Sequence, residues 1–234
     1  MEVRLITTGD GSDTLFVPEL NEHYHSTFGA INESRHIFIE AGLKQIIDKQ
    51  RVIRILEVGF GTGLNTFLTL METGRSDTTI HYTTIEAFPL AAVIIQKLNY
   101  GSLFPGESDL FYKIHDAPWD QEVWLTKSFS LLKMKARLEN FEFQDKPFHL
   151  IYFDAFGPQC QPELWTEEIF KKIFIASHVG AILVTYSAKG EVRRALRKAG
   201  FSTERIEGPT GKREITRATK SFQLTNSPVH HFTR

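Results

Sequence analysis

The most constraining feature of this sequence is a strand-like run that turns through three closely spaced glycines into a helix-like run. Residues 52–67 read VIRILEVGFGTGLNTF, with apolar and β-branched residues up to Val58 and an apolar helix from about Leu64 to Met71. Glycine at such a turn lets the backbone approach a ligand closely, and the start of the helix offers amide donors. The pattern predicts a site for a nucleotide or a nucleotide-like ligand.

The spacing of the glycines and the acids near them distinguish two cofactors. A dinucleotide site is expected to read G-x-G-x-x-G, whereas this loop reads G-F-G-T-G and continues with Leu64. Glu57 precedes the loop, where a carboxylate would repel a pyrophosphate and attract a cation. Glu86 ends the next apolar strand and is placed to accept both ribose hydroxyls. The pattern favours the sulfonium cofactor S-adenosylmethionine (SAM), with an NAD site as the alternative.

The order of strand-like and helix-like segments predicts an α/β fold. We expect a Rossmann-like class I SAM-dependent methyltransferase fold, with a seven-stranded, mostly parallel sheet, helices on both faces and an N-terminal extension. Ligands of such sheets lie beyond the carboxyl ends of the strands, which predicts one cleft around Glu57, Glu86, Asp154 and Tyr186. The expected strands are residues 52–58, 80–85, 129–134, 148–153, 180–186, 201–206 and 213–218, and the expected helical segments are 30–49, 64–71, 89–98, 100–127, 162–174 and 191–198.

Domain organisation and location follow from length and composition. We expect an N-terminal extension over the cleft (1–50), a methyltransferase domain (51–220) and a polar C-terminal tail (221–234). The single Cys160 excludes an internal disulfide, and no Cys/His cluster has zinc spacing. The N-terminus has no apolar signal segment, and no apolar run approaches ~20 residues. These features predict a cytoplasmic protein with no membrane span and no metal.

Charge is unevenly distributed along the chain. Residues 189–234 contain 11 Lys/Arg and 4 Asp/Glu, a balance of +7, and the remainder, with 16 Lys/Arg and 24 Asp/Glu, has −8. A basic C-terminal region of this kind indicates a nucleic-acid face. A solvated helix face with a polar tail explains the same charges equally well.

Asp154 is the candidate catalytic residue. It follows the apolar strand 148–153 and opens the segment DAFGP, so its carboxylate is expected to face the transferable methyl group. An amine must lose a proton before it can accept a methyl group, and a positioned carboxylate can attract the ammonium and accept that proton. The alternative is that Asp154 is a turn or N-cap residue.

Several segments together resemble the methyltransferase half of the MnmC family. They are YHSTFGAINESRHIFIEAGL near the N-terminus, ILEVGFGTGLNTF, YFDAFGPQCQPELWT, TYSAKGEVRRALRKAGF and GPTGKREIT. The resemblance runs from about Tyr24 to Thr216 and implies SAM-dependent methylation of 5-aminomethyl-(2-thio)uridine at the tRNA wobble position. It also implies that Asp154 is catalytic or positions the amine, and that Glu57 and Glu86 belong to the SAM site.

The sequence departs from the family in two places. Bifunctional members carry a flavin-dependent oxidase module, whereas this chain has no second dinucleotide motif and resembles the stand-alone form, so we expect no flavin module. The acid that usually contacts adenine is replaced near Arg137, where Glu139 is the nearest candidate. The predicted cofactor-binding residues are Glu57, Gly59, Phe60, Gly61, Thr62, Gly63, Asn65, Glu86 and Glu139, and the predicted substrate-binding residues are Tyr24, His25, Glu33, Tyr186, Lys212 and Arg213.

Three functions remain open on the sequence alone. The first is an RNA N-methyltransferase with tRNA as partner. The second is a small-molecule amine methyltransferase or an aminopropyltransferase-like enzyme, which would share the acid-rich cleft. The third is a non-catalytic protein that binds SAM or RNA.

Overall fold

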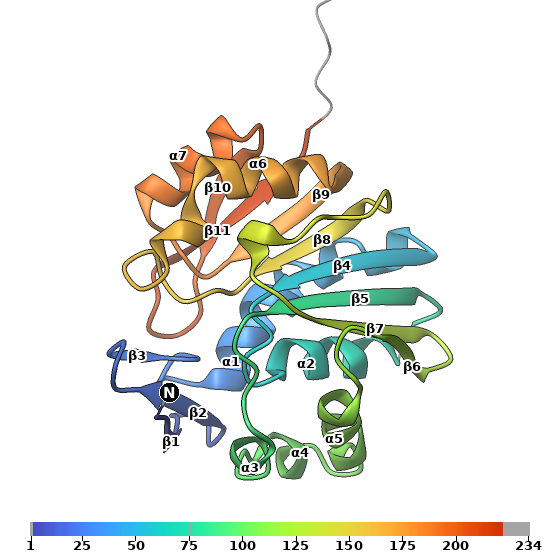
Figure 1. The fold of residues 1–234 in the computed structure, drawn as a ribbon, viewed down its shortest axis with the longest axis vertical. Helices are drawn as coiled ribbons and strands as arrows, with labels where there is room; N and C mark the ends of the chain where they lie inside the picture. The colour runs from blue at the N-terminus through green and yellow to red at the C-terminus, as the bar shows by residue number, and fades with distance from the viewer. Residues whose placement is uncertain (1, 75, 222–234) are drawn as a thin grey trace, which may run out of the picture.

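A mixed sheet forms the centre of the computed structural model, which describes residues 2–74 and 76–221 (Figure 1). Its strand order is β10-β11-β9-β8-β4-β5-β7-β6. The strands are β4 (Val52–Val58), β5 (Thr79–Glu86), β6 (Glu122–Thr126), β7 (Phe129–Lys135), β8 (Phe148–Phe153), β9 (Ser177–Thr185), β10 (Ser202–Glu207) and β11 (Glu214–Thr219). The five central strands β7, β5, β4, β8 and β9 are parallel, so their carboxyl ends meet at one edge.

The predicted fold class is confirmed, but the sheet has eight strands where seven were expected. The additional strand is β6, which pairs antiparallel with β7 at the edge of the sheet. It lies in residues 100–127, which were predicted to be a helical insertion. The segment Glu122–Thr126 alternates exposed and half-buried residues, because only one side of it packs on the protein.

Alternation along the strands gives the sheet two apolar faces. On β4, Ile53 and Ile55 join one core cluster, and Leu56 and Val58 join the other. The first face is covered by α1, α2 and α5, and the second by α6 and α7 (Figure 1). The α-helices are α1 (Ala30–Ser34), α2 (Leu64–Thr73), α3 (Ala92–Ile95), α4 (Tyr100–Leu103), α5 (Ser108–Asp116), α6 (Glu167–Ile175) and α7 (Gly190–Lys198).

The long helix expected at residues 30–49 is interrupted. The chain continues from α1 into a π-helix, η1 (Arg35–Glu40), and then leaves helical geometry at Gly42. Two short 3-10 helices follow, η2 (Leu43–Gln45) and η3 (Ile47–Lys49). Two further 3-10 helices are η4 (Leu138–Asn140) and η5 (Pro162–Trp165), the second of which replaces the start of the helix expected at 162–174. The helix expected at 89–98 is reduced to the four residues of α3.

A small antiparallel sheet precedes the central one. It consists of β1 (Arg4–Thr7), β2 (Asp13–Val17) and β3 (Glu22–His23), and it lies beside α1 on the side of the molecule where α3 and α4 also lie (Figure 1). Asp13 anchors this sheet, because its backbone amide donates to Asn99 Oδ1 at 2.9 Å and its carbonyl accepts from Tyr100 Oη at 2.6 Å. The N-terminal strands are therefore fixed to the segment that follows α3.

No helix among the described residues is long and apolar enough to cross a bilayer. Residues 222–234 of the predicted C-terminal tail lie outside the described residues.

The buried hydrogen bond from Tyr100 to Asp13 should contribute measurably to stability. Tyr100 is fully buried, so Tyr100→Phe leaves the Asp13 carbonyl without its partner and should lower the free energy of unfolding by about 1–3 kcal/mol. Urea denaturation measures the change. Tyr112→Phe is the control, because Tyr112 is 42% exposed. Equal stability of the two variants would contradict a structural role for this bond.

Candidate active site

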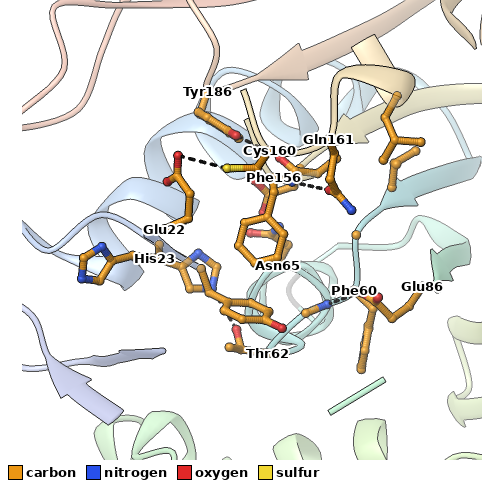
Figure 2. Close-up of a pocket in the computed structure, with 18 of the residues that line it drawn as sticks. Glu22, His23, Phe60, Thr62, Asn65, Glu86, Phe156, Cys160, Gln161 and Tyr186 are labelled. Atoms are coloured by element: carbon orange, nitrogen blue, oxygen red, sulfur yellow. Dashed lines mark hydrogen bonds between the residues drawn. The ribbon is translucent and has the colours of Figure 1, made fainter. Parts of the chain in front are cut away.

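A cavity of about 550 Å³ lies at the carboxyl ends of the parallel strands (Figure 2). Its floor is formed by the loops after β4, β5, β7 and β8, and its walls come from the N-terminal segment and from the loop between β10 and β11. Segments that are distant in sequence therefore converge on one site, as expected for a sheet of this topology.

The glycine loop forms the centre of the floor. Gly59 has a φ of +91°, and a Cβ at this position would lie 2.6 Å from the carbonyl oxygen of Asp154. The two strand ends approach so closely that only glycine fits. The helix α2 begins directly after the loop, and Gly63, its N-cap residue, supplies no side-chain cap to its first amides.

Glu86 connects the loop to the next strand end. Its Oε2 accepts a hydrogen bond from the Gly61 amide at 3.1 Å, and its Oε1 accepts one from the Phe88 amide at 2.8 Å. These bonds fix the carboxylate at the cavity wall (Figure 2). Each carboxylate oxygen has a further lone pair available for a hydroxyl donor.

Glu57 is a predicted site residue that the structure places outside the cavity. It lies on the same face of β4 as Ile53 and Ile55, so its side chain is buried beneath α2 and does not line the cavity. Thr66 Oγ1 donates to one of its oxygens at 3.1 Å, and the other oxygen has no partner among the described residues. Burial raises the pKa of Glu57 to about 8, so the group carries little charge at pH 7. Its role as a cofactor ligand remains a prediction.

Asp154 lies at the end of β8 and lines the cavity. Its amide donates to the Val58 carbonyl at 2.9 Å, and its Oδ2 accepts from Asn65 Nδ2 at 2.8 Å. Burial raises the pKa of Asp154 to about 7, although the hydrogen bond from Asn65 acts in the opposite direction. A carboxyl group with this pKa can exchange a proton near neutral pH.

Residues of the N-terminal segment close one side of the cavity. Tyr24 packs edge-on against Phe156 with 5.0 Å between ring centroids, and its ring lies over Gly61. His25 Nε2 lies 2.8 Å from Thr62 Oγ1. Burial lowers the pKa of His25 to about 4, so this ring is neutral at pH 7 and positions the glycine loop without charge.

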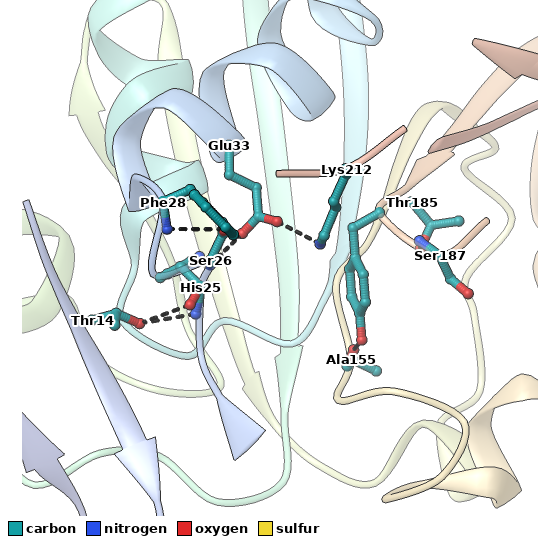
Figure 3. Close-up of polar contacts among 10 residues, drawn as sticks. Thr14, His25, Ser26, Phe28, Glu33, Ala155, Thr185, Ser187 and Lys212 are labelled. Carbon is teal, nitrogen blue, oxygen red and sulfur yellow. Dashed lines mark hydrogen bonds and ion pairs between the residues drawn. The ribbon is translucent and has the colours of Figure 1, made fainter. Parts of the chain in front are cut away.

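An ion pair between Glu33 and Lys212 lies next to this segment (Figure 3). Lys212 Nζ is 2.5 Å from Glu33 Oε1, and the same ammonium lies 4.4 Å from the centroid of the Tyr186 ring. The second oxygen of Glu33 accepts the Ser26 amide at 2.7 Å. Tyr186 Oη donates to the Ala155 carbonyl at 2.9 Å, which connects this wall to the Asp154 loop. A primary ammonium is thus already held between a carboxylate and an aromatic ring inside the cavity.

Most of the predicted site residues share this cavity. Three do not line it: Glu57, Gly63 and the exposed Arg213. Those that do are Gly59, Phe60, Gly61, Thr62, Asn65, Glu86, Glu139, Asp154, Tyr24, His25, Glu33, Tyr186 and Lys212. The functional assignments of all these residues stay predictions.

The sequence reasoning missed several lining residues. Phe88 is 54% exposed, and the Arg137 guanidinium lies 5.3 Å from the centroid of its ring, beside Glu139 at 3.7 Å. Phe28 and Phe156 also line the cavity. The signal for Phe88 was its position two residues after Glu86, because the loop after a strand end lies beside the ligand.

The chain matches a methyltransferase family model over part of its length and is similar in fold to a solved methyltransferase-family structure. Residues 121–221 match the model of a family described as S-adenosyl-L-methionine-dependent methyltransferase. The chain is similar to the solved structure of MnmC2 from Aquifex aeolicus, with a TM-score of 0.77 and 25% identity over 94% of this chain and 72% of that one. The predicted class, a SAM-dependent methyltransferase with SAM as its cofactor, is confirmed.

Relatives identified by sequence indicate which kind of methyltransferase the chain resembles. The chain is 30% identical to the tRNA 5-methylaminomethyl-2-thiouridine biosynthesis bifunctional protein MnmC of Cupriavidus metallidurans over 90% of its own length, and 31% identical to that of Aromatoleum aromaticum over 92%. It spans about a third of the length of these relatives, 33% and 35% respectively. The chain is therefore a relative of the methyltransferase part of MnmC, which confirms the resemblance seen in the sequence.

Among residues 2–74 and 76–221, no cluster of three or more His, Cys, Asp and Glu side chains is placed to hold a metal ion.

Because Glu57 is buried, its contribution to the free energy of unfolding should decrease as the pH rises. Its pKa is raised from 4.5 to about 8, so the stability it contributes is fully present below pH 4.5 and is lost as pH rises through 8. The difference in unfolding free energy between wild type and Glu57→Gln should therefore fall by a few kcal/mol between pH 5 and 9, since one pKa unit corresponds to about 1.4 kcal/mol. Denaturant unfolding across this range measures the difference.

Glu122→Gln is the control for this measurement. Hydrogen bonds from Ser130 and His81 lower the pKa of Glu122, so its contribution should stay nearly constant between pH 5 and 9. A flat profile for Glu57→Gln as well would show that Glu57 is ionised in the folded protein.

Proposed function

We propose that this chain transfers a methyl group from SAM to the amine nitrogen of 5-aminomethyl-(2-thio)uridine at the tRNA wobble position, forming 5-methylaminomethyl-(2-thio)uridine. The observation that carries the proposal is the position of Asp154, which Asn65 holds in the same cavity as the glycine loop and Glu86. The names of the relatives, proteins of tRNA 5-methylaminomethyl-2-thiouridine biosynthesis, support the same substrate. A tRNA substrate would place the chain in the cytoplasm.

The residues around the glycine loop fit SAM. We assign the ribose hydroxyls to Glu86, whose carboxylate is already oriented by two backbone amides. Asn65 lines the cavity, and its Oδ1 has no hydrogen-bond partner among the described residues, so it can accept from the cofactor's ammonium group. Phe88, Arg137 and Glu139 would surround the adenine. Bound SAM would supply a methyl group on a positively charged sulfur.

Asp154 would then prepare the nucleophile. Its carboxylate attracts the substrate ammonium, orients it toward the methyl group and accepts its proton. Because the pKa of Asp154 is about 7, the carboxylate is present in substantial amounts at neutral pH and can also take up a proton there. Methyl transfer needs in-line geometry, so the enclosed cavity contributes by holding the two reactants together.

The proposal is tested by methyl transfer from labelled SAM to either bulk tRNA or polyamines. Label in tRNA supports the proposal, and label only in polyamines would instead support a small-molecule amine methyltransferase, a function that the acid-rich cavity also accommodates. Label in neither acceptor, with SAM bound, would support a non-catalytic protein and contradict both enzymatic functions.

Replacing Asp154 should remove most of the turnover but little of the cofactor affinity. We expect Asp154→Ala and Asp154→Asn to lower kcat by about 10² to 10⁴, because neither side chain can accept the proton or attract the ammonium. The wild-type kcat/KM should rise as pH passes through about 7, where Asp154 ionises. The residual rate of the variants should keep rising at higher pH, as the fraction of neutral amine in solution increases.

Single-turnover kinetics and calorimetry with SAM measure these effects. Asp109→Asn is the control, since Asp109 is exposed on α5 and does not line the cavity. A wild-type rate in Asp154→Asn would contradict the proposed role and favour a turn residue.

Basic side chains near the cavity are proposed to contact tRNA phosphates. Arg194, Arg197 and Arg213 are exposed, and none of them forms an ion pair within the part of the chain that the structure describes. Two arginines of this region also donate hydrogen bonds within the chain: Arg193 to the Ala188 carbonyl, and Arg197 to Thr203 Oγ1 at 3.0 Å. The helix α7 that carries these arginines begins shortly after Tyr186, so it starts beside the cavity.

Charge reversal should weaken tRNA binding in a salt-dependent manner. Arg197→Glu and Arg213→Glu should each reduce the slope of log K against log salt concentration by about 0.7–0.9, because each removes a phosphate contact. Filter binding of tRNA at several salt concentrations measures the slope. Arg51→Glu is the control, since Arg51 is exposed just before β4, at the opposite edge of the sheet. If the two variants kept the wild-type slope, the RNA would have to bind another face.

A further inference from the structure

Phe28 is an exposed aromatic residue at the wall of the cavity. It lies in the short segment between β3 and α1, lines the cavity and is 59% exposed (Figure 3). Its amide donates to Ser26 Oγ at 3.2 Å, which holds the backbone of this segment. A large apolar side chain in this position exposes surface that a ligand can cover.

One side of the Phe28 ring packs against Gly211, in the loop between β10 and β11. Gly211 has a φ of +87°, and a Cβ at this position would collide with the ring. Both the backbone conformation and the close contact therefore require glycine. The ring is supported by backbone on this side, while more than half of the side chain is open to solvent.

Polar groups beside Phe28 continue toward Asp154. Gly211 is followed by Lys212, whose ammonium pairs with Glu33 and lies over the Tyr186 ring. Glu33, Lys212 and Asp154 line the same cavity. This wall of the cavity therefore carries the apolar ring of Phe28 and, next to it, the site where Glu33 and Tyr186 hold the Lys212 ammonium.

An aromatic ring beside a site for a primary ammonium suits a nucleoside that has a flat base and a short aminomethyl group. We propose that Phe28 is the platform on which the target uracil base stacks, so that its 5-aminomethyl group points past Glu33 to Asp154. The inference rests on the proposed function. Proteins that bind unpaired RNA bases commonly stack them on aromatic side chains, and a base that undergoes chemistry must leave its stack in the RNA.

The test uses an anticodon stem-loop RNA with 5-aminomethyluridine at the wobble position and labelled SAM. Phe28→Ala should raise KM for this RNA by about 5- to 150-fold, the range measured when one base loses an aromatic partner. Phe28→Tyr should stay within about threefold of wild type, because it keeps the ring, whereas Phe28→Leu should behave like Phe28→Ala. The SAM dissociation constant should not change, which also shows that each variant is folded.

Two further comparisons separate stacking from other roles. The slope of log K against log salt should be the same in Phe28→Ala and wild type, because stacking removes no phosphate contact. Trp124→Ala is the matched control, since Trp124 is 56% exposed at the sheet edge and does not line the cavity; it should leave KM unchanged.

The outcomes distinguish this inference from the proposed function. If wild type does not methylate the RNA, both are overturned. If wild type is active and Phe28→Ala keeps the wild-type KM, or Phe28→Leu restores it as well as Phe28→Tyr, the stacking role is overturned and the proposed function stands.

Discussion

The close contact between the ends of β4 and β8 determines the arrangement of the whole site. Gly59 leaves no room for a side chain against the Asp154 carbonyl, and the Asp154 amide donates to the Val58 carbonyl. These contacts fix the glycine loop and the catalytic candidate relative to each other through backbone alone. Asn65, in the first turn of α2, then adds a side-chain bond to Asp154. A cofactor in the loop would therefore lie next to the carboxylate without any adjustment of the protein.

Buried charge is the second constraint on the site. Glu57 and Asp154 both have raised pKa values because they are buried, and the charge of Asp154 raises the pKa of Glu57 further. Glu33 is also buried, but Lys212 neutralises it. An acid-rich cavity of this kind favours cations, and both SAM and an alkyl ammonium are cations. Under the proposed function, Glu86 and the ionised form of Asp154 would supply the negative charge for two positive reactants, because Glu57 is largely protonated at pH 7 and Glu33 is paired with Lys212.

Much of this architecture could be predicted from the sequence, because apolar runs identify parallel strands and the residue after each run lies at the ligand edge. Glu86 and Asp154 were found in this way. Glu57 is the exception, because its register with Ile53 and Ile55 puts it under α2 and outside the cavity. The strand β6 was missed although Val123 and Leu125 alternate with exposed residues. The contact between the Phe28 ring and Gly211 could not be predicted, because the two residues lie far apart in the sequence.

The central claim, that this cavity directs a methyl group to an amine on a wobble uridine, is tested most directly by locating the transferred group. The protein is incubated with SAM carrying a deuterated methyl group and an anticodon stem-loop with one 5-aminomethyluridine, and the RNA is digested to nucleosides for mass spectrometry. We predict that one deuterated methyl group appears on the amine nitrogen of that nucleoside and on no other. Label on a base or ribose elsewhere, or no label in the RNA when SAM is bound, would contradict the account.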